Sequence, residues 1–301
     1  MNNKRRLFST VLCVAALTAG LFVSGCGSDK AGGIGSVVSS VVDGGDEKAA
    51  AKLNTLIDAT NRFNSDNASF AQFQAEGLAK LKGGFAEGAI TNQPHFDRLQ
   101  ADLEKAKKEG STFKEVDAER DNVLNILNEL VPVYKDLTAY DDSKAYMNDG
   151  GAKGKELAAK YVAAVEKFDV AYAKFNETLN KVNAEQSKKQ IEKLKKDGKK
   201  GYAAAMESTL RLTELVDKLE KAPQNADKAA VEKELSEIEA LLKSINNDRG
   251  QVLADRYNSV VGDVRQVLAD PSDNNLNNMI EGFNGYIDTY NSTTPDQFDA
   301  K

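Results

Sequence analysis

The sequence predicts an all-α protein, an elongated antiparallel multi-helix bundle that occupies residues 47–301. Three observations predict it. From Glu47 onward, apolar residues recur at spacings of three and four, which is the period of an amphipathic helix. Short polar sequences with Gly, Pro or Asp separate these stripes, and helices joined by short turns pack antiparallel. The sequence shows no sustained alternation of apolar and polar residues, so strands are not expected.

The composition excludes several classes of protein. The 301 residues contain two cysteines and one histidine, which rules out a disulfide-dense scaffold, a zinc cage of Cys and His, and a multi-histidine metal site. The formal net charge is −6, and an acidic chain argues against broad nucleic-acid binding. We therefore expect no nucleic-acid partner and a fold that depends on packing.

Residues 1–25 have the layout of a secretory signal peptide, in which a basic start precedes an apolar stretch that ends at Val23. Residues 23–26 read Val-Ser-Gly-Cys, which resembles the lipobox of bacterial lipoproteins. The resemblance implies a diacylglycerol on the sulfur of Cys26, cleavage between Gly25 and Cys26, and acylation of the new amine. An uncleaved membrane anchor is the alternative, because the apolar stretch approaches the roughly 18 residues that a span needs.

A flexible tether is expected over residues 26–46, which are rich in Gly and Ser and begin with the lipidated cysteine. Cleavage removes three positive charges and no acid, so the formal net charge falls from −6 to −9. The residue after Cys26 is Gly27 and not Asp, which favours the periplasmic side of the outer membrane if the organism has two membranes. The expected location is the bacterial cell envelope, with membrane contact through the lipid and no cofactor besides it.

Four stripes of apolar residues at helical spacing predict four helices before residue 141. They are Leu53, Leu56, Ile57 and Phe63; Phe70, Phe73, Leu78 and Leu81; Phe96, Leu99, Leu103 and Ala106; and Val116, Val123, Leu127, Val131 and Tyr134. The second helix should stop at Gly83-Gly84 and the third at Gly110. Pro132 should kink or split the fourth, which ends at a polar turn over 141–151.

The longest predicted helix covers residues 153–200. Its apolar seam has steps of four and three like a coiled coil and consists of Tyr161, Val165, Phe168, Tyr172, Phe175, Leu179 and Val182. We expect this seam to be intrachain core, with a ligand slot or a dimer interface as alternatives. Asn176, Asn180 and Asn183 lie beside it and are expected to make interhelical hydrogen bonds or to be exposed, with a polar groove as the alternative.

Four further helices are expected after a turn at Gly198 and Gly201. Their apolar stripes are Tyr202, Met206, Leu210, Thr213 and Val216; Val231, Leu235, Ile238, Leu242 and Ile245; Leu253, Tyr257, Val260, Val264 and Leu268; and Leu276, Ile280, Phe283, Ile287 and Tyr290. Proline stops the first of them near Pro223 and the third at Pro271.

Three segments resemble the YiiG-like lipoproteins, a family with a helical domain of unknown function. KLNTLIDATNRFN at 52–64 is similar to their opening helix, and FNGYIDTYNS at 283–292 to their closing one. The best match is 139–183, with a tyrosine–acidic turn, an Ala-Lys-Gly-Lys step and a long aromatic helix. Members often have a histidine where Ala158 stands here. The resemblance implies a lipid-anchored, all-helical envelope protein and supplies no catalytic site.

A strongly basic stretch covers residues 188–200. Its lysines are Lys188, Lys189, Lys193, Lys195, Lys196, Lys199 and Lys200. The stretch could contact anionic lipid headgroups or acidic envelope polymers. The alternative is a solvated helix end, where lysines also suit the helix dipole.

Other candidate residues have ordinary structural explanations. Asp141, Asp142 and Asp149 crowd one turn and could hold Ca²⁺, but their spacing does not match an EF-hand, so turn-forming and capping roles are expected. His95 is expected in a loop or cap. The sequence has no G-x-S-x-G, Walker A or H-E-x-x-H motif. The acid pairs expected to form salt bridges on a helix face are Glu232 with Glu234 and Glu237 with Glu239.

These features favour a non-enzymatic envelope lipoprotein that binds a protein or polymer partner through its helical surface. The alternative is a carrier of a small molecule or metal ion in a pocket between helices. An enzyme would require a buried carboxylate or lysine with a strongly shifted pKa in a cleft.

Replacing Cys26 by Ser should abolish metabolic labelling with palmitate, because the Cys26 thiolate is the nucleophile that accepts the lipid. Cys13→Ser is the matched control and should leave labelling intact, because Cys13 lies in the part that cleavage removes. Gel analysis of labelled cells checks this, and a wild-type protein that takes up no palmitate would contradict lipidation.

Overall fold

The computed structural model describes residues 46–68, 70–110 and 113–300, and all regular secondary structure in them is helical. This confirms the all-α prediction. The signal peptide, Gly25, Cys26 and the tether as far as residue 45 lie outside the described residues. Among the helices in the described part of the chain, none combines the length and the apolar character that a membrane span requires.

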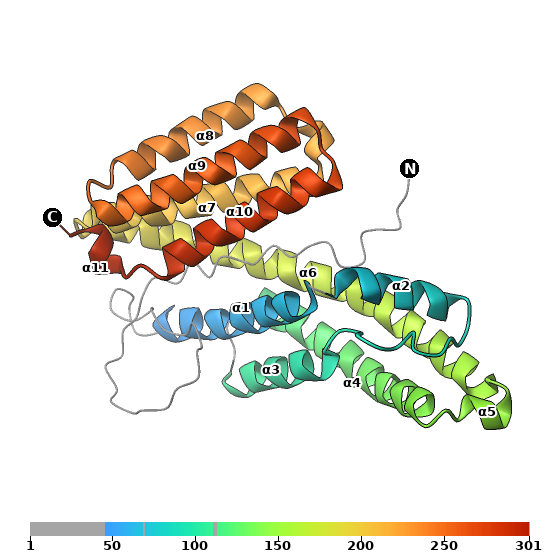
Figure 1. The fold of residues 1–301 in the computed structure, drawn as a ribbon. Helices are drawn as coiled ribbons and strands as arrows, with labels where there is room; N and C mark the ends of the chain where they lie inside the picture. The colour runs from blue at the N-terminus through green and yellow to red at the C-terminus, as the bar shows by residue number, and fades with distance from the viewer. Residues whose placement is uncertain (1–45, 69, 111–112, 301) are drawn as a thin grey trace. The chain divides into compact units, whose positions relative to one another are not determined.

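The helices form two compact units, Lys52–Val182 and Asn183–Lys301, and the boundary between them falls within the long helix α6 (Figure 1). Each unit has its own set of buried apolar side chains. The prediction of one domain over 47–301 stays a prediction, since compact units can belong to one domain or to two.

Unit 1 contains the first five helices and the first part of α6. Their bounds are α1 (Asp46–Ala68), α2 (Ala71–Lys82), α3 (Phe96–Lys108), α4 (Lys114–Asp142), α5 (Tyr146–Asp149) and α6 (Ala152–Lys196). Ion pairs tie α1 to α3: Arg62 lies 3.1 Å from Asp102, and Arg98 lies 2.5 Å from Asp66.

An aromatic cluster fills the centre of unit 1. Its rings come from four helices and are Phe63, Phe96, Tyr134, Tyr161, Phe168 and Tyr172. The ring centroids of Phe96 and Phe168 lie 5.0 Å apart at an interplanar angle of 79°, which is the favourable edge-to-face arrangement. The seam of α6 is buried from Tyr161 to Val182 except at Tyr172, which is half-buried. This confirms that the seam is intrachain core.

The turn between α4 and α6 accounts for the tyrosine–acidic and Ala-Lys-Gly-Lys sequences. The Tyr140 hydroxyl donates to Asp149 Oδ1 at 2.6 Å. Gly154 packs against two aromatic rings: a Cβ there would lie 2.4 Å from the Tyr140 ring and 2.6 Å from the Phe85 ring. These residues serve helix packing, and glycine is required because no side chain fits at 154.

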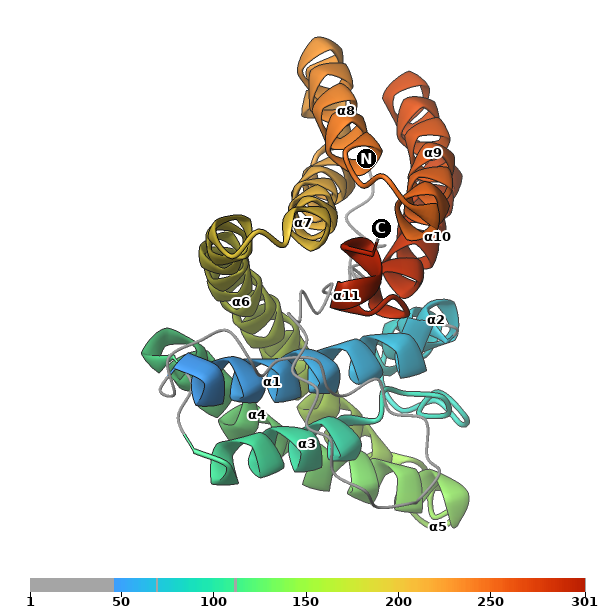
Figure 2. The same cartoon turned by 90° about the vertical axis from the view of Figure 1, so that its left-hand side faces the viewer.

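Unit 2 contains the rest of α6 and a four-helix bundle. The bounds are α7 (Lys200–Lys221), the 3₁₀ helix η1 (Pro223–Asn225), α8 (Lys228–Lys243), α9 (Asp248–Ala269), α10 (Asp273–Asn291) and α11 (Pro295–Phe298). Each of α7 to α10 contacts the next, and α10 returns to α7. Figure 2 shows α7 and α8 on one side of the bundle and α9 and α10 on the other.

Buried hydroxyls link the helices of this bundle. Tyr286 of α10 lies 3.2 Å from Ser208 and 3.1 Å from Thr209 of α7, hydroxyl to hydroxyl. Tyr257 of α9 donates to the carbonyl of Leu235 in α8 at 2.5 Å. A buried tyrosine hydroxyl needs such a partner, so these bonds fix which residues of adjacent helices lie opposite each other.

Polar caps and prolines set the helix ends in unit 2. The side chains of Asp227, Asn247 and Ser272 accept hydrogen bonds from backbone N–H groups in the first turns of α8, α9 and α10. Pro223 and Pro271 follow the ends of α7 and α9, as the sequence predicts.

The stripe predicted for α2 is partly wrong. Phe70 and Phe73 are 41% and 60% exposed, although their spacing suggested a core face. The buried face of α2 instead contains Gln74, Leu78 and Leu81. The reason is that α2 is short and carries two apolar sets, and only the tertiary contacts decide which set turns inward.

Helix α4 runs through Pro132 without being split, which leaves a kink as the form of that prediction that stands. One further detail differs from the expectation. Gly198 does form the turn, with φ +78°, but Gly201 lies in the first turn of α7. A Cβ at Gly201 would lie 2.0 Å from the carbonyl oxygen of Phe298 in α11, a short helix that the sequence did not predict. Gly201 therefore serves the docking of α11.

Gly154→Ala should lower the free energy of unfolding by about 1–3 kcal/mol, because the added methyl group overlaps two aromatic rings. Thermal unfolding followed by circular dichroism measures this. Gly262→Ala in α9 is the control: a Cβ there meets nothing within 4 Å, so the variant should gain about 0.5–1 kcal/mol from helix propensity. Equal stability of the two variants would contradict the close packing at Gly154.

Candidate functional site

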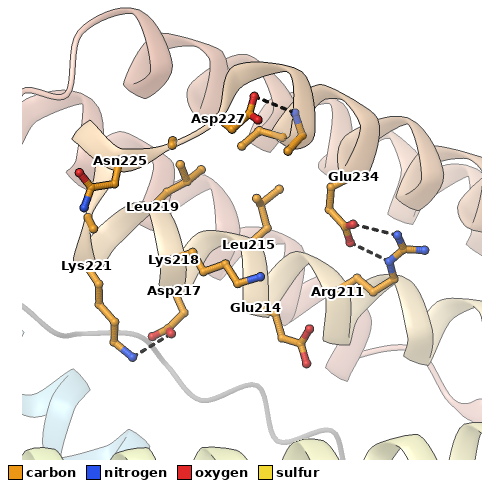
Figure 3. A pocket seen from close by; sticks show the side chains of 14 residues that line it. Arg211, Glu214, Leu215, Asp217, Lys218, Leu219, Lys221, Asn225, Asp227 and Glu234 are labelled. Atoms are coloured by element: carbon orange, nitrogen blue, oxygen red, sulfur yellow. Dashed lines mark hydrogen bonds and ion pairs between the residues drawn. The ribbon is translucent and has the colours of Figure 1, made fainter.

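Unit 2 contains a half-open pocket where the end of α7, η1 and the start of α8 meet (Figure 3). Its volume is about 570 Å³, within the range of roughly 300–1,000 Å³ that small-molecule sites occupy. The floor is apolar and consists of Leu215, Leu219, Ala222, Ala226, Ala230 and Val231. The rim is polar and consists of Arg211, Glu214, Asp217, Lys218, Lys221, Asn225, Asp227 and Glu234.

Local sequence explains why a hollow forms here. Pro223 ends α7 and begins the 3₁₀ turn, and Asp227 then caps α8, with its Oδ1 accepting from the N–H of Ala229 at 2.9 Å. Three residues that line the hollow from this turn and the start of α8 are alanines, Ala222, Ala226 and Ala230. Because methyl groups fill little space, they leave a hollow between the end of α7 and the start of α8.

Arg211 of α7 is held by two acids of α8. Its Nε and Nη2 donate to the two carboxylate oxygens of Glu234 at 2.7 and 2.9 Å, and Nη2 also reaches Glu237. The hydrogen bond from Arg211 lowers the pKa of Glu234, and the bond to Glu234 raises the pKa of Arg211. Both groups therefore stay ionised at neutral pH, which suits neither for proton transfer.

Most other charges of the rim are also paired. Lys221 Nζ lies 2.8 Å from Asp217, and Glu214 lies 3.1 Å from Nζ of Lys188 on α6. Lys218 differs: among the described residues its side chain makes no hydrogen bond and no ion pair, although its charge helps to lower the pKa of Glu234. Figure 3 shows Lys218 on α7 among the residues that line the pocket.

The lysine-rich stretch is less basic than its sequence suggests. Lys195 lies 2.8 Å from Glu207 and Lys199 lies 3.3 Å from Asp296, in addition to the pair that Lys188 makes. Lys189, Lys193, Lys196 and Lys200 have no ion-pair partner among the described residues. The stretch ends α6 and begins α7, and acids of the same chain neutralise part of it.

Two carboxylates of the acidic turn accept hydrogen bonds from backbone N–H groups. Asp141 Oδ2 accepts from the N–H of Gly88 at 2.9 Å. Asp149 accepts from the N–H groups of Gly151 and Lys153 at 2.9 and 3.1 Å. Among the described residues, no group of three or more Asp, Glu, His or Cys could hold a metal ion.

The remaining predicted residues lie apart from the pocket, except Glu234. His95 is the exposed N-cap residue of α3, without a side-chain cap bond. Glu232 pairs with Arg265 at 2.8 Å and Glu239 with Lys243 at 2.6 Å, which confirms the salt-bridge prediction for the acid pairs. Asn176 is partly buried and forms a side-chain hydrogen bond with Tyr172 of its own helix. The expectation was an interhelical hydrogen bond or exposure, and this residue shows neither.

In three carboxylates, removal from water by burial raises the pKa as far as about 6 or 7. The pKa is about 6 for Asp58, about 7 for Asp169 and about 7 for Glu220. Both carboxylate oxygens of Glu220 are buried without a hydrogen-bond partner. Glu220 lies on α7 between two pocket-lining residues, but none of these three carboxylates lines the pocket.

Sequence reasoning did not find the pocket. Its residues come from α7, η1 and α8, and neither their spacing nor their chemistry forms a motif. The recurrence of alanine at 222, 226 and 230, on both sides of Pro223, was the available signal. It marks a place where small side chains recur on one face, but it does not show what faces them.

Comparison with protein families gives a match to a family model. The model of a family described as a protein of unknown function (DUF3829) matches residues 47–252, which include every residue that lines the pocket. No curated protein matches the chain, and no solved structure does. The match does not bear on the narrower resemblance to YiiG-like lipoproteins.

Glu220→Gln should stabilise the protein by about 1–3 kcal/mol at pH 8 and change little at pH 5. Burial raises the pKa of this carboxyl from 4.5 to about 7, so the folded state holds the proton more tightly than the unfolded chain. The stability linked to it is complete below about pH 4.5 and is lost as the pH rises through 7. Thermal melts across this range measure the effect.

The control for Glu220→Gln is Glu281→Gln, which removes an exposed carboxylate from α10. It should leave the pH dependence of the melting temperature unchanged. A Glu220→Gln variant with the wild-type pH profile would show that this carboxyl titrates normally.

Proposed function

Because the chain belongs to the DUF3829 family, whose function is unknown, we propose that it is a lipid-anchored envelope protein that acts by binding and not by catalysis. The observation that carries the proposal is the pocket between α7 and α8, an apolar floor surrounded by charges that are mostly neutralised. Such a site offers shape and contact area to a ligand.

The anchor is proposed from the sequence. The Val-Ser-Gly-Cys at 23–26 follows a signal-peptide pattern, and the resemblance to YiiG-like lipoproteins supports the same location. Two or three acyl chains hold a protein on a bilayer far more firmly than one. Of the basic stretch, Lys189, Lys193, Lys196 and Lys200 are the residues left to meet anionic headgroups or polymers.

Binding without catalysis is supported by the electrostatics of the pocket. A general acid or base works best with a pKa near the working pH, whereas the bidentate bond to Arg211 lowers the pKa of Glu234. The carboxylates that do have pKa values near 7, Asp169 and Glu220, do not line the pocket. They would therefore not reach a ligand held there.

The pocket favours a small molecule over a metal ion as ligand. Glu234, Asp217 and Glu214 already hold cationic partners at 2.7–3.1 Å, and a metal would have to displace them. A partner protein or polymer bound to the helical surface is the second candidate. It is supported by Phe70 and Phe73, large apolar side chains that α2 leaves exposed.

Native mass spectrometry of the protein, extracted gently from its own membrane, should show a bound small molecule. The bound mass should disappear in Ala230→Trp, which fills the pocket from an exposed position of α8. Crosslinking in intact cells, with Cys26→Ser as the unanchored control, tests the second candidate. If the mass spectrum shows only the protein without a ligand, and crosslinking recovers only the monomer, both the small-molecule ligand and the protein or polymer partner are contradicted.

A further inference from the structure

We propose that the pocket between α7 and α8 binds a small amphiphile with an anionic headgroup, which Lys218 recognises while the apolar floor holds the tail. The inference rests on the proposed binding function of this pocket and names the class of ligand. It follows from three observations. All but one of the charged side chains on the rim are engaged by partners within the described part of the fold, the floor is apolar, and a single exposed ion pair alone would bind an anion only weakly.

The charges of the rim leave one ammonium group without a partner. Arg211 is held by Glu234, and Lys221 is held by Asp217. Of the two remaining acids, Glu214 pairs with Lys188 and Asp227 caps α8. Among the described residues that line the pocket, Lys218 is thus the charged side chain with neither a hydrogen bond nor an ion pair.

The position of Lys218 suits an anion that enters the pocket. Lys218 lines the pocket together with Glu234. The hydrogen bond from Arg211 is the main cause of the lowered pKa of Glu234, and the charge of Lys218 adds a smaller contribution. Leu215 and Leu219, which flank Lys218 on α7, line the same pocket with apolar side chains (Figure 3). An anionic group placed there would pair with Lys218 while the rest of the molecule faces apolar side chains.

The floor supplies the second half of the site. Leu215, Leu219 and Val231 are themselves packed into the bundle, so they form a firm surface. The alanines at 222, 226 and 230 leave the space above them free. A short alkyl chain could cover this surface and remove it from water.

Neither half of the site would be sufficient alone. An exposed ion pair strengthens binding by at most about fivefold, and the acids near Lys218 oppose a free anion. A bare inorganic anion would therefore be held weakly. A cation would have to compete with Arg211 and Lys221 for acids that are already paired. An anion with an apolar tail matches both the unpaired ammonium and the floor.

The test measures the binding of octanoate to the full-length protein in lipid nanodiscs by isothermal titration calorimetry, with the signal of empty nanodiscs subtracted. Octylammonium and 1-octanol share the tail but not the charge, and acetate shares the charge but not the tail. Octanoate should bind more tightly than 1-octanol by up to about fivefold, and it should also bind more tightly than octylammonium and acetate.

Three variants locate the effect. Lys218→Gln should weaken octanoate binding about fivefold and leave 1-octanol unchanged. Lys228→Gln removes the same charge from an exposed residue of α8 that does not line the pocket, and it should bind octanoate like the wild type. Ala230→Trp should abolish binding of every probe while the circular dichroism spectrum stays that of a folded helical protein.

The outcomes separate this inference from the function on which it rests. If octanoate and octylammonium bind with equal affinity, or if Lys218→Gln leaves the affinity for octanoate unchanged, the proposal of an anionic ligand is wrong. If Ala230→Trp still weakens binding in that case, the pocket remains the binding site. Absence of binding by all probes, or binding that Ala230→Trp does not affect, overturns the pocket as the site as well.

Discussion

Burial of apolar faces between helices is the interaction on which the whole described structure depends. Both cysteines of the chain lie within the first 26 residues, so no disulfide can join the helices of either unit. In unit 1 the rings of Phe63, Phe96 and Phe168 come from three different helices and meet at centroid distances of 5.0–6.0 Å. Close packing of this kind tolerates little added volume, which is why a glycine is needed at 154.

The same packing rule explains the pocket in unit 2. Along most of α7 and α8, large apolar residues such as Leu212, Leu235 and Ile238 fill the interior of the bundle. At the end where the helices join, alanines replace them and a hollow remains. Ion pairs across the rim, such as that of Arg211 with Glu234, hold the two helices together on either side of a space that their side chains do not fill.

Charged side chains in this protein mainly neutralise one another. The lysine-rich stretch has the most basic sequence in the chain, but three of its lysines form ion pairs, with Glu214, Glu207 and Asp296. In the acidic turn, the carboxylates of Asp141 and Asp149 accept hydrogen bonds from backbone N–H groups. A charge left without such a partner is therefore informative, because most of its neighbours are engaged within the fold.

The sequence by itself determined the long helices and most of their ends. Spacings of three and four residues place apolar side chains on one face, and caps such as Asp227 or stops such as Pro271 act on their own chain within a few residues. The long helix through Val182 and the buried seam from Tyr161 follow from the same local pattern. These features depend on residues that are close in sequence, so no tertiary contact is needed to predict them.

Tertiary structure alone decided the rest. The pocket requires α7 to face α8, the partners of Lys188 and Lys199 lie 26 and 97 residues away in the chain, and Gly201 is explained only by α11. Phe70 and Phe73 belong to a stripe as regular as those that are buried, yet they are exposed. The physical reason is that periodicity shows which residues share a face, whereas the packing of distant segments determines what that face meets.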